Sequence, residues 1–201
     1  MSEGFLDPYL EPETGILRNL VGASTSAELA QAEADLVAVR IIQLRDHQLV
    51  PSTRDLHEVQ GLHRHLFQDI FPWAGEIRTI DMRRGDGDFF APCAGIPVNL
   101  DNVFVSLSHQ GYLQDLDEGE FLKALAHFYD DLNFIHPFRE GNGRAQRLFW
   151  SRVAFDAGWI LDWAPVYGPE LNESSRLARE KGDVAALEKT LAKCVRPIQH
   201  S

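Results

Sequence analysis

Twelve consecutive residues, His136–Arg147, bring together side chains that could act on a phosphate group. The segment reads His-Pro-Phe-Arg-Glu-Gly-Asn-Gly-Arg-Ala-Gln-Arg. It holds a histidine that could accept a proton, a carboxylate, a Gly-Asn-Gly turn and two arginines. Few structural requirements would place these groups so close together, so the segment indicates chemistry on a nucleotide phosphate.

The glycines of this segment are suited to a phosphate cradle. Gly141 and Gly143 flank Asn142 where a helix is expected to begin, at about Gly143 or Arg144. Glycine lets the backbone adopt positive φ and approach a phosphate closely. Unpaired backbone N–H groups and the positive end of the helix dipole attract anions there. The physics resembles that of a P-loop, although the sequence is not a Walker motif.

Two arginines, Arg144 and Arg147, follow within the first turn of this predicted helix, on adjoining positions of one face. The helix dipole disfavours a cation at an N-terminus, so the pair needs a compensating anion. Planar guanidinium groups match phosphate oxygens. This match favours a phosphate over the alternative, which is a pair of solvated arginines or of local salt bridges.

Two further residues of the segment suggest a metal site and a base. Glu140 precedes the turn, and one carboxylate beside bound phosphates is typical of a Mg²⁺ site; the alternative is a carboxylate that complements the helix dipole without metal. His136 would suit a general base at its ordinary pKa of about 6.5; the alternative is a histidine that only caps the preceding helix. Phe138 should point inward and anchor the loop.

Helical periodicity dominates the elements that must position these groups. Thr25 and Glu28 have capping-box spacing at the start of the first helix, and the second helix is expected to start near residues 51–52. Pro137 should end the helix before the motif at or just after Ile135. Apolar residues at helical intervals predict seven helices, over about 25–42, 52–70, 96–107, 121–135, 143–157, 169–180 and 184–195.

The stretch between the second and third predicted helices breaks this pattern. Ile77–Met82 is partly alternating, Asp86-Gly87 is a hairpin signal, and Phe89–Ala91 could form the return strand. A lone hairpin is only marginally stable in water, so it must lie against the helices or hold something; a simple connector is the alternative. The sequence thus predicts a mainly α domain over residues 24–201 with one small β-hairpin, after an arm over residues 1–23.

The composition restricts the function classes. The chain has 201 residues and a net charge of −11, so its surface would repel nucleic acid, and direct nucleic-acid binding is not expected. Two cysteines without ligand spacing argue against structural zinc and disulfides and favour a reducing cytoplasm. His63 should be a packed or surface histidine, because no carboxylate or cysteine completes a metal set. Neither a leader pattern at the start nor a membrane-spanning apolar run is present.

The twelve-residue segment resembles the HxFx(D/E)GNGRxxR motif of the Fic family. Every defined position is matched, by His136, Phe138, Glu140, Gly141, Asn142, Gly143, Arg144 and Arg147. The resemblance extends over most of the chain. Asp7–Tyr9 and Gly15–Asn19 resemble the N-terminal arm of small bacterial Fic toxins, and Phe71–Arg78 is similar to the segment that opens the family's β-hairpin flap.

The resemblance implies a Fic-type helical bundle and a protein adenylyltransferase, with ATP as co-substrate and Mg²⁺ as cofactor. His136 would deprotonate a hydroxyl of a target protein, and Glu140 would coordinate Mg²⁺ between the α- and β-phosphates. Residues 141–143 would form the anion hole. Arg144 would hold the β-phosphate side, and Arg147 would reach the γ-phosphate.

The resemblance also implies how a target is held. The flap, at about residues 78–91, would clamp an extended target segment by strand addition. Its contacts would come from Ile80, Asp81, Met82 and Phe89. Related toxins modify DNA gyrase and topoisomerase IV, which makes these the expected targets. The adenine pocket is expected to involve the C-terminal helices.

Control of the activity is expected to come from another protein. Many Fic proteins carry an inhibitory glutamate in the pattern (S/T)xxxE(G/N). Ser24 and Glu28 have this spacing, but Leu29 stands where Gly or Asn is expected. The resemblance therefore implies the toxin of a toxin–antitoxin pair, whose small antitoxin supplies the glutamate in trans.

Two other functions fit the same residues. The first is a Fic-fold kinase or another nucleotidyl or phosphoryl transferase; Doc-type kinases carry Lys where this chain has Gly143, which favours nucleotidyl transfer. The second is a non-catalytic nucleotide-binding module. Such a module has no need for a base, and His136 and Glu140 are both present.

Overall fold

The computed structural model describes residues 7–46, 48–85 and 87–199. Over these residues it contains seven α-helices, two short 3₁₀ turns and one small antiparallel sheet, which confirms the prediction of a mainly α fold. In chain order the elements are α1 (Ser26–Asp46), α2 (Leu56–Phe67), η1 (Cys93–Gly95), α3 (Ile96–His109), η2 (Gly111–Leu113), α4 (Glu118–Ile135), α5 (Asn142–Asp156), β1 (Trp159–Leu161), α6 (Gly168–Lys181), α7 (Val184–Leu191) and β2 (Val195–Pro197).

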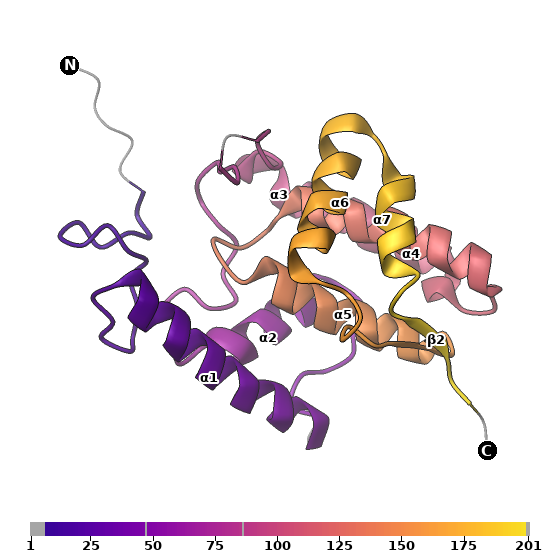
Figure 1. The fold of residues 1–201 in the computed structure, drawn as a ribbon, viewed down its shortest axis with the longest axis horizontal. Coiled ribbons are helices and arrows are strands. Elements are labelled where there is room, and N and C mark those ends of the chain that lie inside the picture. The colour runs from indigo at the N-terminus through magenta and orange to yellow at the C-terminus, as the bar shows by residue number, and fades with distance from the viewer. Residues whose placement is uncertain (1–6, 47, 86, 200–201) are drawn as a thin grey trace.

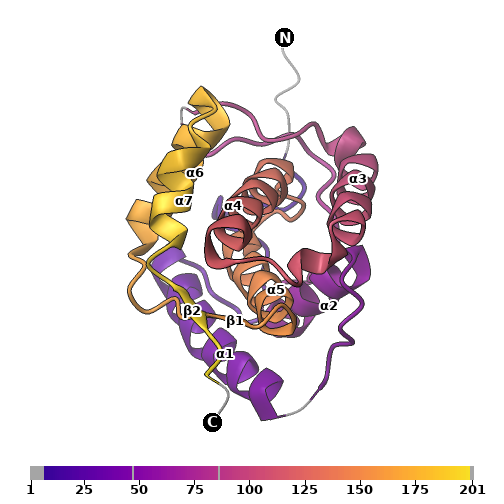
Figure 2. The ribbon, with the colours of Figure 1, turned by 90° about the vertical axis from the view of Figure 1, so that its right-hand side faces the viewer.

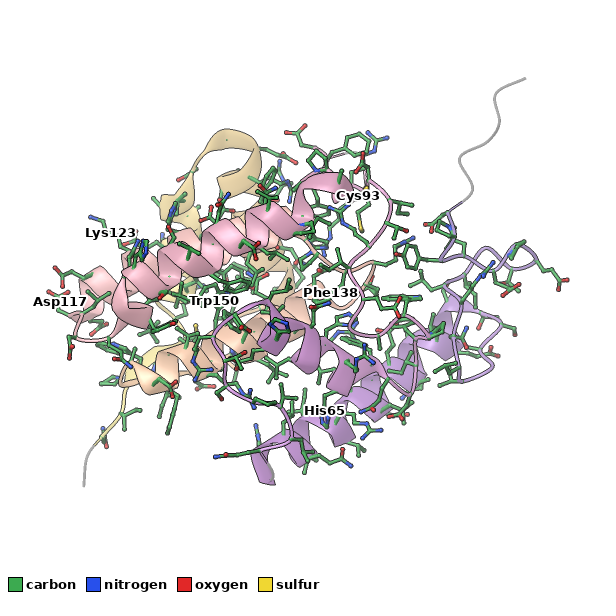
Figure 3. The ribbon with its side chains drawn as sticks, turned by 180° about the vertical axis from the view of Figure 1, so that it is seen from behind. His65, Cys93, Asp117, Lys123, Phe138 and Trp150 are labelled. Atoms are coloured by element: carbon green, nitrogen blue, oxygen red, sulfur yellow. The ribbon has the colours of Figure 1, made fainter. Side chains whose placement is uncertain are left out.

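Helices α4 and α5 form the centre of the bundle (Figure 2). Helices α2 and α3 lie on one side of this pair, and α6 and α7 lie on the other. Helix α1 runs along the outside of α2 (Figure 1). Trp150 and Phe138 are among the largest fully buried side chains, and Figure 3 shows Trp150 between α4 and α5. The motif segment therefore joins the two central helices of the bundle.

The ends of these two helices follow from local chemistry. Helix α4 begins with a capping box, in which the Asp117 carboxylate accepts from the Glu120 amide at 2.9 Å. It ends at Ile135, as predicted, because Pro137 disfavours helical backbone in the residue before it. His136 takes a left-handed conformation there, with φ +48°. Helix α5 begins at Asn142, slightly earlier than predicted, after Gly141 with φ +81°.

Several predicted helix boundaries differ from the structure, and two of them have a local cause. The second helix starts at Leu56, not near residues 51–52, because the Asp55 carboxylate caps the amides of His57 and Glu58. The last helix stops at Leu191 rather than at residue 195. The chain after it pairs antiparallel with β1, with Val195 opposite Leu161. These three-residue strands are too short to show a period-2 pattern.

The flap is less regular than the predicted hairpin. Asp86, in its expected turn, lies outside the described residues. In the described part of residues 78–91, backbone pairing consists of one bridge between Arg83 and Phe89 and two bonds, from the Phe90 amide to the Met82 carbonyl at 3.0 Å and from the Gly87 amide to the Arg84 carbonyl at 3.2 Å. The expected return strand at residues 89–91 is therefore wrong, and the small sheet of the molecule lies at β1–β2 instead.

The described part of the N-terminal arm, from residue 7, packs on the helical body. Tyr9 is buried, and its hydroxyl accepts from the Thr79 amide at 3.0 Å. Asp7 forms an ion pair with Arg139 of the motif segment at 2.8 Å. The arm thus contacts both the base of the flap and the loop between α4 and α5. No helix in the described residues combines the length and the apolar character needed to cross a bilayer.

Candidate active site

His136 presents one ring nitrogen as an acceptor at the start of the α4–α5 loop. Its Nδ1 lies 3.2 Å from the Asn133 carbonyl oxygen, which can only accept, so Nδ1 carries the proton. Nε2 of the neutral ring is then free to accept a proton. The ring stacks on Phe90 of the flap at 3.7 Å between centroids and 8° between planes. Helix end and flap together fix the orientation of the ring.

Burial and neighbouring cations keep this ring neutral. His136 is only 6% exposed, and burial lowers its pKa to about 3, with further lowering by Arg84, Arg78 and Arg179. The sequence had suggested an ordinary pKa. The structure instead places an uncharged imidazole here over the whole neutral pH range.

A buried arginine joins the flap to this helix end. Arg78 is 2% exposed, and its guanidinium donates to the carbonyl oxygens of His136, Ile80, Ala91 and Ile135 at 2.5 to 3.2 Å. These carbonyls include the last ones of α4, which have no partner within the helix. Arg78 therefore fixes both ends of the flap against the residue that carries the candidate base.

The loop itself is closed by Asn142. Its side-chain oxygen accepts from the Phe138 amide at 2.8 Å, and its side-chain nitrogen donates to the Phe138 carbonyl at 2.7 Å. Phe138 is buried, as predicted, and stacks on the His63 ring at 3.9 Å between centroids. The Asn142 side chain thus holds the loop shape, and its backbone amide remains available for an anion.

His63 supports the loop from α2. Its Nδ1 accepts from the Gly75 amide at 2.8 Å, so its Nε2 carries the proton and donates to the Glu140 carbonyl at 2.8 Å. His63 is fully buried, and burial lowers its pKa to about 3. The prediction of a packed histidine is confirmed. Its link between the loop and Gly75 was not predicted.

The start of α5 forms the anion-attracting side of the site. Arg144 and Ala145 both donate their amides to the Gly141 carbonyl, at 3.1 Å each. The amides of Asn142 and Gly143 precede these bonds and have no partner within the helix. The Arg147 guanidinium lies beside these amides. Its Nη1 would be 4.0 Å from a Cβ added to Gly143. No ion pair engages the Arg147 guanidinium among the described residues.

Glu140 and Arg144 share a small charged cluster. Glu140 Oε1 accepts from the Gly141 amide at 2.9 Å and lies 3.5 Å from Arg144 Nη2. The Glu140 side chain is 45% exposed, so its other oxygen is accessible. Arg144 makes its shorter ion pair, 2.5 Å, with Glu33 of α1. The sequence predicts a phosphate as the partner of Arg144, with local salt bridges only as the alternative.

The four expected target-contact residues lie in different environments. Phe89 is 58% exposed, and the Arg83 guanidinium lies 5.5 Å from its ring centroid. Asp81 is exposed and accepts from the Cys93 amide at 2.7 Å. Met82 is half-buried. Ile80 is the exception, because its side chain is buried and its carbonyl accepts from Arg78, so Ile80 belongs to the base of the flap.

The two buried histidines predict a pH dependence of stability. The pKa of each is about 3 in the fold and 6.5 ordinarily, so the unfolded chain binds more protons between these values. The contribution of the two histidines to the free energy of unfolding is therefore fully present above pH 6.5. It should fall as pH drops towards 3, by up to about 1.4 kcal/mol per pH unit for each histidine. The Asp130 pKa, raised to about 6 by burial, opposes this between pH 3.8 and 6.

Urea unfolding at pH 7 and pH 5, on the wild type and on His136→Ala, measures the contribution of one histidine. We expect the wild type to lose more stability than the variant between these pH values, since the variant lacks one of the two buried imidazoles. Equal losses in both proteins would show that His136 is not buried as a neutral ring.

This combination of fold and site defines the class of protein. Residues 53–154 match the model of the Fic/DOC family, a segment that includes the whole α4–α5 site. A relative from Escherichia coli K12, named "Probable protein adenylyltransferase Fic", is 35% identical over 94% of this chain and 92% of its own length. The chain therefore belongs to the Fic/DOC family.

Further relatives agree with this assignment. "Protein adenylyltransferase VbhT" of Bartonella schoenbuchensis is 34% identical over 86% of this chain, which spans 36% of that longer protein. The crystal structure of BepC from Bartonella tribocorum, with bound AMPPNP, matches with a TM-score of 0.90 and 24% identity over 95% of this chain and 97% of that one. The last likeness shows that the fold is shared.

Proposed function

We propose that this chain is a protein adenylyltransferase that transfers AMP from ATP to a hydroxyl side chain of another protein. One observation carries the proposal. A neutral histidine with a free Nε2 lies at the entrance of a loop, and that loop ends in the amides of Asn142 and Gly143 beside the guanidinium of Arg147. The arrangement joins a proton acceptor to a triphosphate cradle.

The reaction follows from these positions. Nε2 of His136 takes the proton of the target hydroxyl, whose oxygen attacks the α-phosphorus of ATP; the bond to the β-phosphate oxygen breaks and pyrophosphate leaves. The anionic phosphates raise the pKa of His136 above its value in the free protein, so the ring accepts the proton more readily. Amides of Asn142 and Gly143 stabilise the charge on the phosphate oxygens, and Arg144 and Arg147 pair with the leaving diphosphate.

Glu140 fits a Mg²⁺ ligand. Its side chain is 45% exposed at the mouth of the loop, and only Oε1 is engaged, by the Gly141 amide. A single carboxylate that supplements phosphate oxygens and waters is the usual protein share of such a site. Mg²⁺ bound there would neutralise charge on the α- and β-phosphates.

Labelled ATP distinguishes this activity from phosphorylation. We expect label from [α-³²P]ATP to appear on protein and label from [γ-³²P]ATP not to appear, in the presence of Mg²⁺. Gly143 supports this outcome, because Doc-type kinases have Lys at that position. Transfer from the γ position alone would show that the chain is a kinase.

The flap is proposed to present the target hydroxyl to His136. Phe89 and Asp81 are exposed on it, and the neighbouring Phe90 stacks directly on the His136 ring. An extended target segment held along the flap would therefore lie beside Nε2. DNA gyrase and topoisomerase IV in the cytoplasm are the first targets to test.

Inhibition is proposed to come from a separate antitoxin. Glu28, which follows Ser24 with the spacing of the inhibitory pattern, has an exposed side chain whose Oε2 accepts from Ser24 and Thr25 at 2.8 to 3.1 Å. These bonds hold it at the start of its own helix as a cap. Glu28→Gln should therefore leave the self-modification of the purified chain unchanged, and a sharp rise would contradict inhibition in trans.

A further inference from the structure

Arg144 is held by a residue that lies outside the motif and outside the segment matched by the family model. Glu33 is on α1, and its Oε2 lies 2.5 Å from Arg144 Nη2. The two side chains are 14% and 27% exposed, so this ion pair is shielded from bulk water on most sides. A shielded, charge-assisted hydrogen bond of this kind fixes geometry more strongly than a surface pair does.

The guanidinium of Arg144 is fixed at two places. Its central carbon lies 4.6 Å from the centroid of the Phe67 ring, so one face is covered. Its Nη2 contacts Glu33 and, at the longer distance of 3.5 Å, Glu140. Within the described residues only Nη2 hydrogen-bonds to protein, so Nε and Nη1 keep their donors for an anion.

We propose that Glu33 is a positioning residue for the nucleotide, which acts through Arg144. The inference rests on the proposed function of the same site. Glu33 holds one corner of the guanidinium, so the remaining N–H groups are oriented before ATP binds. It also keeps Arg144 nearer to α1 than to Glu140, since the two distances are 2.5 and 3.5 Å.

Loss of this ion pair has a definite consequence. Glu140 is then the nearest carboxylate to Arg144, and the two would pair fully. That pairing would withdraw the cation from the phosphates and the carboxylate from Mg²⁺ at the same time. Nucleotide binding should therefore weaken, and it should need more Mg²⁺.

The attachment of α1 does not depend on Glu33. Arg40 of the same helix pairs with Asp69 at 2.7 Å, and the buried side chains of Leu29 and Val37 pack in the core beneath it. Removing the Glu33 charge should consequently leave the helix in place. A change in nucleotide binding can then be separated from a change in folding.

The test is calorimetric binding of a non-hydrolysable ATP analogue to the full chain at several Mg²⁺ concentrations. We expect Glu33→Gln to weaken binding roughly fivefold, to raise the Mg²⁺ requirement and to raise KM for ATP with little change in kcat. Asp35→Asn, a charge change on the exposed side of α1, is the matched control and should bind as the wild type does.

Two further variants decide whether Glu33 acts through Arg144. In an Arg144→Ala background, Glu33→Gln should cause no additional loss. An equal loss in that background would overturn the inference, and so would wild-type or tighter binding by Glu33→Gln alone. A wild-type chain that binds no analogue would instead overturn the proposed function, and this inference with it.

Discussion

His136→Ala should abolish AMP transfer, with a loss of roughly 10³- to 10⁴-fold, which is the upper part of the range for a general base. Nε2 of His136 is the acceptor that the structure places at the mouth of the phosphate loop, and alanine offers none. Binding of ATP should remain largely intact, because the amides and arginines of α5 are unchanged. Initial rates with [α-³²P]ATP and calorimetric ATP binding measure the two effects.

Two variants separate the expected loss of activity from an effect on folding. His136 has φ +48°, which asparagine tolerates better than alanine does, so His136→Asn should fold well and still be inactive. His57→Ala changes an exposed histidine of α2 and should retain full activity. Substantial transfer by either His136 variant would show that another group accepts the proton.

Gly141→Ala should destabilise the chain and remove nucleotide binding. A Cβ at this position would lie 2.4 Å from two carbons of the Phe67 ring, and the backbone has φ +81°. Left-handed strain and overpacking together should cost about 2–5 kcal/mol. Relief of the overlap would also move Phe67, which supports the guanidinium of Arg144.

Gly143→Ala is the matched comparison. Gly143 does not have positive φ, and the side-chain atom nearest to an added Cβ would be Arg147 Nη1, at 4.0 Å. The free energy of unfolding of Gly143→Ala should therefore differ from that of the wild type by less than about 1 kcal/mol. Urea unfolding and ATP binding of both variants check the difference, and equal destabilisation would contradict the close approach of Gly141 to Phe67.

The candidate catalytic segment, His136–Arg147, could be identified from the sequence because its groups are adjacent in the chain. Local rules then fixed much of its shape: Pro137 ended α4, and Gly141 preceded α5 with the positive φ that glycine allows. Phe138 was recognisable as an anchor because it is the large apolar residue among polar neighbours. In such a segment, residue type and spacing carry most of the information.

The residues that support this segment could not be identified from the sequence, because they come from distant parts of the chain. Arg78 reaches four carbonyls across the flap and α4, and His63 joins α2 to the loop. Glu33 lies 111 residues from its partner Arg144. Nothing in local periodicity distinguishes these residues from ordinary helical or loop positions, since only the tertiary fold brings them to the site.

The flap shows that a local sequence signal can also predict more regular structure than the chain forms. Its sequence has a hairpin signal, yet the residues described on either side of the turn share only one bridge and two further backbone bonds. Side-chain donors from Arg78 replace the missing ladder at the base of the flap. The two strands that do form a sheet, β1 and β2, are far apart in sequence, so a local turn signal could not have indicated them.

The measurement that tests the central claim most directly is mass spectrometry of cellular proteins after controlled expression of this chain in a bacterial host. We predict that expression of the wild type adds the mass of one AMP to a hydroxyl residue of a target protein, and that expression of His136→Asn does not. A target that gains only the mass of a phosphate, or an AMP adduct that persists with His136→Asn, would contradict AMP transfer by this site.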